Sequence, residues 1–422
     1  MKILLRGAKY FTPSGFVDGD IAVDSQSVYK NCLPDNFTSD IEININGCFV
    51  IPGFVDVHTH LREPGFSYKE SILSGTKAAA KGGYTSLCTM PNVHPVPDNL
   101  ENLQQQLEII KRDAITEVLP YGSITQGEKG LALSDMENLS PLVVAFSDDG
   151  VGVAKKNIML DAMTKAAKLD KIIAAHCEDV TLIKKGGCIH EGRFAKKHNL
   201  TGINAKSEWL QVKRDILLCK KTGCKYHVCH VSTKKSVDII RKAKKKGINV
   251  TCETAPHYLC FSENDLVDEG RFKMNPPIRT EKDRQALIEG IIDGTIDIIA
   301  TDHAPHSVAE KSGGLTDSKM GVSGLETSFA ALYTYLIKKG IISLEKLIYC
   351  MAISPRKIFG IDKLGITLDS PNLAVLDLNA CWTVKGEEFV SKGKSSPYEG
   401  KTLYGQNILT IKDGRIIWQK RN

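Results

Sequence analysis

The sequence predicts an α/β fold: a (β/α)8 TIM-type barrel with a small β-sandwich domain formed from both termini. From residue 51 onward, short apolar runs alternate with helical stretches, which is typical of strand–helix units in a parallel sheet. The two ends of the chain instead carry strand patterns and turn glycines. The 422 residues could hold a barrel of roughly 250 residues and a smaller companion. We therefore expect the barrel at 51–362 and the β-domain at 1–50 and 363–422.

Eight apolar runs are the expected barrel strands: 54–60, 85–92, 117–125, 142–150, 172–179, 226–232, 249–256 and 297–305. Helical patterns lie between them at 68–81, 99–113, 156–169, 205–221 and 233–246. Gly82 and Gly247 stand where helix C-caps are expected. In the terminal parts, alternating patterns predict strands at 3–8, 19–23, 373–378 and 408–417.

Composition and charge exclude several classes of protein. Hydrophobic residues make up 42% and charged residues 25% of the chain, which predicts a globular protein rather than a disordered one. The N-terminus has no sustained apolar run and no cleavage site, so we expect a cytoplasmic protein without membrane contact. The basic cluster at 241–246 falls at a helix end, where the helix dipole favours lysine, and no aromatic residues interleave with it. We therefore expect no nucleic-acid binding.

The first expected strand ends in a pair of histidines, His58 and His60. Side chains alternate along a strand, so both imidazoles should project to one face and could chelate a divalent ion. Three further strand ends carry His176, His230 and Asp302. Residues at the carboxyl ends of barrel strands build the active site. Nitrogen and oxygen ligands of this kind favour Zn²⁺ over Mg²⁺ or Ca²⁺, so the sequence predicts a zinc site.

The fourth expected strand ends in Ser147-Asp148-Asp149-Gly150 and contains no lysine. A residue of this strand should face the same cavity and could bridge two metals. The neighbouring cysteines Cys177 and Cys229 should point to the opposite face of their strands and pack in the core.

These motifs resemble the class I dihydroorotases among the cyclic amidohydrolases, and the resemblance covers nearly the whole chain. It rests on DVHTHLREPG at 56–65, ATDHAPH at 300–306 and Lys311, and on shorter matches at 90–92, 175–179, 274–277 and 324–327. The resemblance implies two Zn²⁺ ions per chain, with the metal ligands His58, His60, Asp149, His176, His230 and Asp302. It implies substrate contacts from His60, Arg62, Asn92, Asn275, His306 and the backbone at Met320 and Gly321.

The implied reaction is the reversible cyclisation of N-carbamoyl-L-aspartate to L-dihydroorotate in pyrimidine biosynthesis. A metal-bound hydroxide would attack the ring amide, and Asp302 would carry the proton. Arg62 offers a planar fork of donors that matches the substrate carboxylate.

Two alternatives stay open at this point. One is a hydantoinase or an allantoinase, although both typically supply a carbamylated lysine from the fourth strand. The other is a non-catalytic subunit that scaffolds aspartate transcarbamoylase, although such a subunit should have lost ligands. The sequence leaves the oligomeric state open, and both a homodimer and an association with aspartate transcarbamoylase are compatible with it. The segment 307–319, rich in Gly, Ser and charge, is either a lid or a passive loop.

Overall fold

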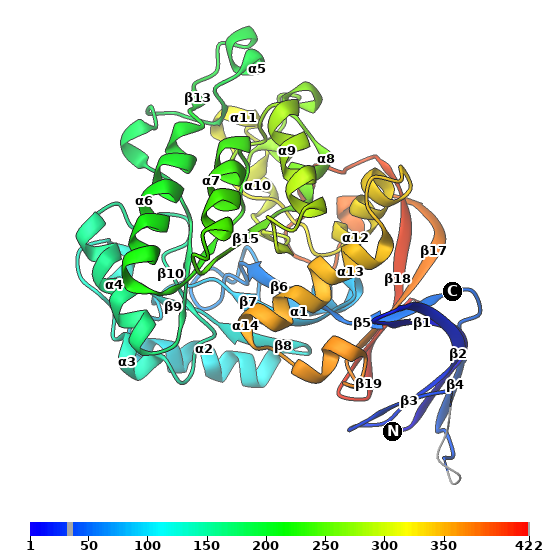
Figure 1. Cartoon of the computed structure of the whole chain (residues 1–422). Coiled ribbons are helices and arrows are strands. Elements are labelled where there is room, and N and C mark those ends of the chain that lie inside the picture. The colour runs from blue at the N-terminus through cyan, green and yellow to red at the C-terminus, as the bar shows by residue number, and fades with distance from the viewer. Residues whose placement is uncertain (32–36, 421–422) are drawn as a thin grey trace.

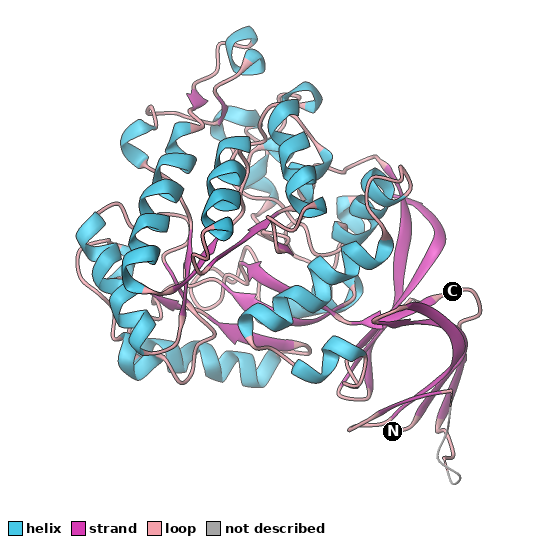
Figure 2. Ribbon diagram, viewed as in Figure 1, coloured by secondary structure: helices cyan, strands magenta, loops and turns pink. Residues whose placement is uncertain are grey.

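The computed structural model describes residues 1–31 and 37–420, which form a mixed α/β fold. Helices surround a group of short parallel strands, and a sheet of terminal strands lies at one side (Figures 1 and 2). No helix within the described ranges is long and apolar enough to cross a membrane.

Nine short strands account for the eight predicted runs, because the run at 117–125 is divided in two by Tyr121. They are β6 (Phe54–Thr59), β7 (Tyr84–Thr89), β8 (Glu117–Pro120), β9 (Gly122–Ser123), β10 (Phe146–Ser147), β11 (Ile172–Ala175), β14 (Lys225–Val228), β15 (Val250–Thr254) and β16 (Ile298–Ile299).

The parallel strands follow one another in a cyclic order. One sheet has the order β6-β7-β8 and another the order β16-β15-β14-β11-β10-β9. A parallel bridge between Thr59 and His303 joins the end of β6 to the segment after β16. The order of strands along the chain is therefore also their order in space.

Helices follow most of these strands. The longer ones are α1 (Ile72–Gly82), α2 (Leu100–Asp113), α4 (Lys156–Lys168), α6 (Lys206–Thr222), α7 (Lys234–Lys245) and α9 (Glu281–Ile292). The shorter ones are α3 (Met136–Leu139), α5 (Arg193–Lys197), α8 (Pro256–Cys260), α10 (Val308–Lys311), α11 (Gly314–Asp317), α12 (Ser328–Leu332), α13 (Leu344–Ile348) and α14 (Ser354–Phe359).

The five predicted helices are confirmed, with one correction at each end of α1. The helix begins after Ser71, whose side chain caps the amide of Ser74, and not at residue 68. Gly83, with a φ of 89°, takes the left-handed C-cap position predicted for Gly82. Gly82 is needed for a different reason, since a Cβ there would lie 2.3 Å from the carbonyl oxygen of Leu325. Gly247 does take a left-handed φ, of 69°.

Strands from both ends of the chain share one eight-stranded sheet. They are β1 (Ile3–Thr12), β2 (Gly15–Val23), β3 (Val28–Lys30), β4 (Ile41–Asn44), β5 (Phe49–Pro52), β17 (Leu373–Thr383), β18 (Thr402–Lys412) and β19 (Arg415–Gln419). The order is β19-β18-β17-β5-β1-β2-β3, with β4 paired to β1. The antiparallel pair β5–β17 therefore joins the two ends of the chain.

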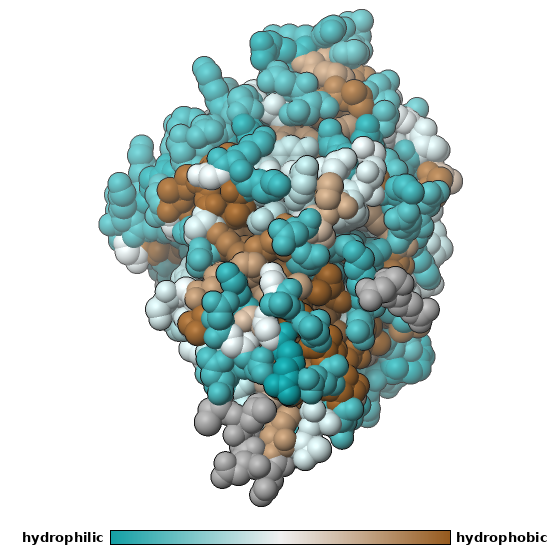
Figure 3. Space-filling view, turned by 90° about the vertical axis from the view of Figure 1, so that its right-hand side faces the viewer, coloured by the Kyte–Doolittle hydropathy of each residue, from teal (hydrophilic) through white to brown (hydrophobic). Residues whose placement is uncertain are grey.

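Apolar side chains from both termini, including Ile3, Val50, Leu373 and Ile411, form one buried cluster on this sheet. Hydrophilic side chains surround several apolar patches on this side of the molecule (Figure 3). The two-layer sandwich and its boundaries stay a prediction.

Candidate active site

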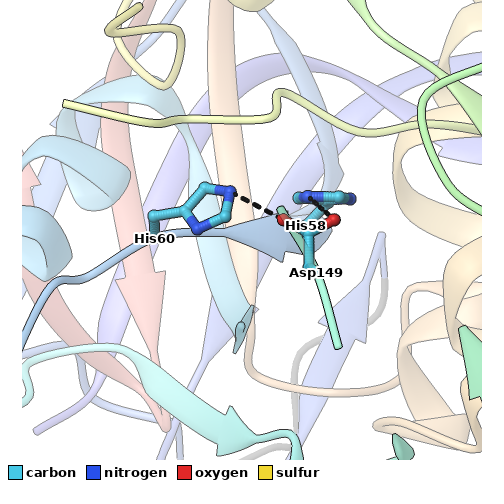
Figure 4. Close-up of side chains that lie close together, drawn as sticks. All are labelled: His58, His60 and Asp149. Carbon is cyan, nitrogen blue, oxygen red and sulfur yellow. Dashed lines mark ion pairs between the residues drawn. The ribbon is translucent and has the colours of Figure 1, made fainter. Parts of the chain in front are cut away.

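Two groups of buried side chains share Asp149. His58, His60 and Asp149 form one trio, and Asp149, His176 and His230 form the other. Within each trio the candidate ligand atoms all lie within 4.8 Å of one another. His58 and His60 both direct imidazole nitrogens toward the Asp149 carboxylate (Figure 4). Asp149 is the only residue common to these two trios, as expected of a ligand between two metals.

The topology explains why residues so far apart in sequence meet here. His58 belongs to β6 and His60 follows it, while the other members of the trios follow β10, β11 and β14. Asp302 follows β16. Because the carboxyl ends of parallel strands meet at one edge, these side chains converge at that edge.

The distances between candidate ligands suit a metal. Two atoms that bind the same tetrahedral zinc, at about 2.0–2.1 Å each, lie about 3.3 Å apart. Asp149 Oδ1 is 3.4 Å from His58 Nε2 and 3.3 Å from His230 Nε2, and Asp149 Oδ2 is 3.4 Å from His60 Nε2. His176 Nδ1 lies 3.7 Å from Asp149 but only 2.9 Å from His230 Nε2, so this last pair must separate slightly to share an ion.

Asp302 lies beside the first trio, with Oδ1 3.3 Å from His60 Nε2 and 3.6 Å from His58 Nε2. Burial alone would raise the pKa of this carboxyl, but the close contact with His60 and the charges of the other nearby histidines hold it below its ordinary value. Asp302 and His230 have left-handed φ values of 48° and 34°. Such a conformation costs about 1–3 kcal/mol for a residue other than glycine, and such residues cluster at functional sites.

The unpaired nitrogen of His58 is the clearest sign that the residues fit a metal. Its Nε2 is buried and has no hydrogen-bond partner among the described residues, whereas its Nδ1 lies 2.6 Å from Glu253 Oε1. A buried polar atom without a partner is destabilising, and a metal ion would satisfy it. The nitrogen and carboxylate donors around it are those that zinc accepts.

The two aspartates after β10 have different surroundings. Asp148 accepts hydrogen bonds from the amides of Ile124 (2.7 Å) and Thr125 (3.0 Å) and from the hydroxyl of Thr125. Burial raises the pKa of Asp148 to about 6. Asp148 therefore anchors the loop after β9, which leaves Asp149 to face the histidines.

A cavity of about 200 Å³ opens beside the trios. It is lined by His60, Arg62, Asn92, Asp149, Gly150, His176, Asn275, Asp302, Ala304, His306, Met320 and Gly321. All the residues predicted to contact substrate are among them. His58 and His230 do not line the cavity, but both lie close to Asp149, which does.

Arg62 is a buried cation without a carboxylate partner among the described residues. The residue is 9% exposed, and the one hydrogen bond of its side chain goes from Nε to the carbonyl of Pro305 at 3.4 Å. Burial lowers the pKa of Arg62 to about 10. A guanidinium that faces a cavity with most of its donors free is suited to binding an anion.

The two predicted asparagines also contact other site residues. Asn92 Oδ1 lies 2.8 Å from His60 Nδ1, so His60 donates this proton and turns Nε2 toward the carboxylates. Asn275 Nδ2 donates to Glu178 Oε2 at 3.1 Å, and the same oxygen lies 3.5 Å from His176 Nε2. Asn275 Oδ1 has no partner within the described residues.

His306 and Gly321 form another part of the cavity wall. His306 Nε2 donates to the carbonyl of Met320 at 2.8 Å, and the Gly321 amide donates to Lys273 at 3.0 Å. Burial, with the charges of Arg62 and Lys69, lowers the pKa of His306 to about 3, so this ring is neutral. Gly321 has a φ of 133°, and a Cβ there would lie 2.4 Å from the Ala304 oxygen.

The segment 307–319 contains α10 and α11, and Glu310 and Lys311 hold it to neighbouring parts of the chain. Lys311 Nζ donates to the carbonyls of Lys273 (3.0 Å) and Lys319 (2.7 Å), and Glu310 pairs with Lys69 at 3.0 Å. Movement of this segment as a lid stays a prediction.

The sequence analysis overlooked two carboxylates near the site, Glu178 and Glu253, but its prediction that two neighbouring cysteines pack in the core is confirmed. Cys177 and Cys229 are both buried in the core. Glu253 lies in the buried strand β15 and is 1% exposed. A charged residue within an apolar strand needs a partner, which was the signal available in the sequence.

The fold and site define a class, that of the hydrolases that bind divalent metals at the carboxyl ends of parallel strands. The structure resembles the L-hydantoinase (dihydropyrimidinase) from Arthrobacter aurescens, with 25% identity and a TM-score of 0.88, covering 100% of this chain and 96% of that one. It also resembles the dihydropyrimidinase from Brevibacillus agri NCHU1002, at 20% identity and a TM-score of 0.85, covering 99% and 95%. The second likeness shows the fold alone.

Sequence comparisons identify the family. Residues 47–236 match the family model described as dihydro-orotase-like. The chain is 46% identical to the dihydroorotases of Bacillus cereus (strain AH820) and Bacillus anthracis (strain A0248), covering 100% of this chain and 99% of each relative. The chain therefore belongs to the dihydroorotase family.

Proposed function

We propose that the chain is a dihydroorotase, which interconverts N-carbamoyl-L-aspartate and L-dihydroorotate. One observation carries the proposal: the unpaired guanidinium of Arg62 faces the same cavity as Asp149, the residue shared by the two trios. The substrate has a carboxylate beside a cyclic amide. The Arg62 guanidinium matches the carboxylate, and the metal site proposed around Asp149 matches the cyclic amide. The names of the relatives at 46% identity support the same activity.

The proposed metal ligands are His58, His60, Asp149, His176, His230 and Asp302. We propose that each trio would hold one Zn²⁺ ion and that Asp149, which belongs to both trios, would be a ligand common to the two. When bound, the ions would lower the pKa of a water molecule and polarise the ring carbonyl.

The chain's own groups would bind the substrate and move the proton. Arg62 would hold the substrate carboxylate in a charge-assisted pair, with the side-chain amide of Asn92 as a further donor and the neutral ring of His306 in contact with the substrate. Asn275, with its free Oδ1, would accept from a ring N–H. Asp302 would accept a proton during ring opening and return it to the departing ring nitrogen.

The proposal includes the architecture that positions these groups. The cyclic order of parallel strands supports a (β/α)8 barrel over 51–362, with a terminal β-domain from 1–50 and 363–422. The cavity would then lie at the carboxyl end of the barrel, where such enzymes bind substrate.

The hydantoinase alternative has one observation in its favour, the structural similarity to the L-hydantoinase. Against it, Asp148 and Asp149 follow β10 where a carbamylated lysine is expected, and none of the cavity-lining residues is a lysine. A purely scaffolding subunit is not supported either, because all six proposed ligands are present in one chain.

The test is an assay of the metal-replete protein against dihydroorotate, hydantoin and allantoin, with metal content measured on the same sample. Turnover of dihydroorotate alone, with about two zinc ions per chain, is the expected result. Preferred turnover of hydantoin or allantoin would overturn the proposed substrate.

A further inference from the structure

Glu253, in β15, lies directly behind the candidate metal site. Its Oε1 is 2.6 Å from His58 Nδ1, and its Oε2 is 3.2 Å from His227 Nε2. Glu253 is 1% exposed, and both histidines are fully buried. A carboxylate removed from water thus contacts the ring nitrogen of His58 opposite the one that faces Asp149.

The same carboxylate also contacts the second trio. The backbone amide of His230 donates to Glu253 Oε1 at 3.3 Å, in the part of the chain where His230 takes its left-handed φ of 34°. His58 belongs to one trio and His230 to the other. Glu253 therefore contacts one member of each trio without lining the cavity.

His227 contacts the other oxygen of the Glu253 carboxylate, Oε2. While its Nε2 faces Glu253, its Nδ1 lies 2.8 Å from Thr251 Oγ1. Both carboxylate oxygens therefore have partners, as a buried charge requires. The resulting chain of contacts runs from Thr251 through His227 and Glu253 to His58 and joins β14, β15 and β6.

A third metal position is an alternative explanation, because His58, Cys229 and Glu253 also form a trio of candidate ligands. The distance between His58 Nδ1 and Glu253 Oε1, 2.6 Å, argues against it. Two ligands of one zinc lie about 3.3 Å apart, whereas 2.6 Å is close to the length of a charge-assisted N–H···O hydrogen bond, about 2.7–2.9 Å. His58 therefore donates from Nδ1 and keeps Nε2 free.

We propose that Glu253 is a positioning residue on which both metal positions depend. Through its side-chain contact it fixes His58 in the tautomer with a free Nε2, and through the amide of His230 it fixes the backbone of a ligand in the other trio. The inference rests on the metal site proposed above. Losing such a partner behind a ligand typically weakens metal binding about 10–100-fold.

The test is a zinc titration of the full chain in competition with a chromophoric chelator. Glu253→Gln is nearly isosteric and retains an acceptor oxygen but removes the charge. Asp215→Asn is the matched control, because Asp215 is a fully buried carboxylate that pairs with Arg214 and contacts no member of either trio. We expect zinc binding at both steps to weaken about 10–100-fold in Glu253→Gln and to stay unchanged in Asp215→Asn.

A zinc affinity of Glu253→Gln within twofold of the wild-type value at both binding steps would overturn the role of Glu253. Nitrogen NMR of the wild-type imidazoles with zinc bound gives a second measurement that does not depend on the variant folding. We expect a protonated Nδ1 at His58, and an unprotonated Nδ1 would overturn the inference. If the wild-type chain itself binds no zinc, the proposed metal site fails, and the role of Glu253 with it.

Discussion

The side-chain oxygen of Asn92 lies 2.8 Å from Nδ1 of His60, so Asn92 orients a candidate metal ligand from the cavity wall. This contact gives Asn92 a role apart from the substrate contact predicted from the sequence. The two roles respond differently to substitution.

Asn92→Ala should weaken zinc binding and lower kcat/KM together, because His60 loses the acceptor for its Nδ1 proton. Asn92→Asp retains that acceptor but adds a negative charge to the wall that would face the substrate carboxylate. We expect this variant to hold zinc at the wild-type stoichiometry and to lose mainly kcat/KM. Zinc content and steady-state kinetics check both; equal zinc loss in the two variants would contradict the orienting role.

Arg62→Met should leave the zinc content intact and lower kcat/KM for dihydroorotate. The corresponding loss of transition-state stabilisation should be about 2–4 kcal/mol, as expected from loss of a hydrogen-bonded charge and its positioning. The control is Arg193→Met, because the Arg193 side chain is 84% exposed, far more than that of Arg62. Unchanged kcat/KM in Arg62→Met would remove the carboxylate assignment.

Substitution of each of the two aspartates after β10 should distinguish a residue that binds metal from one that anchors a loop. Asp149→Ala should lower the zinc stoichiometry, whereas Asp148→Ala should mainly lower the melting temperature, because Asp148 caps the amides of Ile124 and Thr125. Metal analysis and calorimetry of both variants distinguish the two effects, and the reverse pattern would mean that the bridge was assigned to the wrong residue.

Recovery of activity after chelation and return of zinc should not need bicarbonate, because no lysine carbamate has to form.

Asp302→Asn should lower kcat by at least about 10²-fold while some zinc remains, because the amide can bind a metal but cannot accept the proton. The pKa of Asp302 is held below its ordinary value, so the carboxylate form that ring opening needs is present at neutral pH. Because this carboxyl is already ionised, ring opening should rise with pH only as the metal-bound water loses its proton, whereas cyclisation, which needs the acid form of Asp302, should fall as the pH rises. If Asp302→Asn keeps wild-type rates in both directions and a normal zinc content, Asp302 is only a metal ligand, and His306 is the next residue to test as the proton carrier.

Lys311 should make the stability of the protein depend on pH. Burial, together with the charge of Lys273, lowers the pKa of Lys311 from 10.5 to about 7. Between these values the unfolded chain binds a proton that the folded protein does not, so stability should rise with pH from about 7 to 10. Lys311→Met should flatten this part of the dependence relative to wild type, as measured by the melting temperature at several pH values. An identical slope in both proteins would contradict the lowered pKa.

The sequence predicted the parallel strands and the longer helices because these depend on local patterns. All eight apolar runs contain a strand, although β10 and β16 are only two residues long. The strand β10 ends just before Asp148, which turns back to the loop after β9, and β16 ends before Asp302, which takes a left-handed φ. Hydropathy alone does not carry that information.

The sequence by itself determined which residues would gather, since His58, His60 and the residues after β10, β11, β14 and β16 stand at strand ends, and strand ends of a parallel sheet converge. Only the tertiary structure decided what each residue contacts. Glu253 meets His58 across 195 residues of chain, and Asn92 meets His60 across 32. Contacts of this kind depend on the packing of neighbouring strands and on which ring nitrogen finds a partner, and neither leaves a periodic pattern in the sequence.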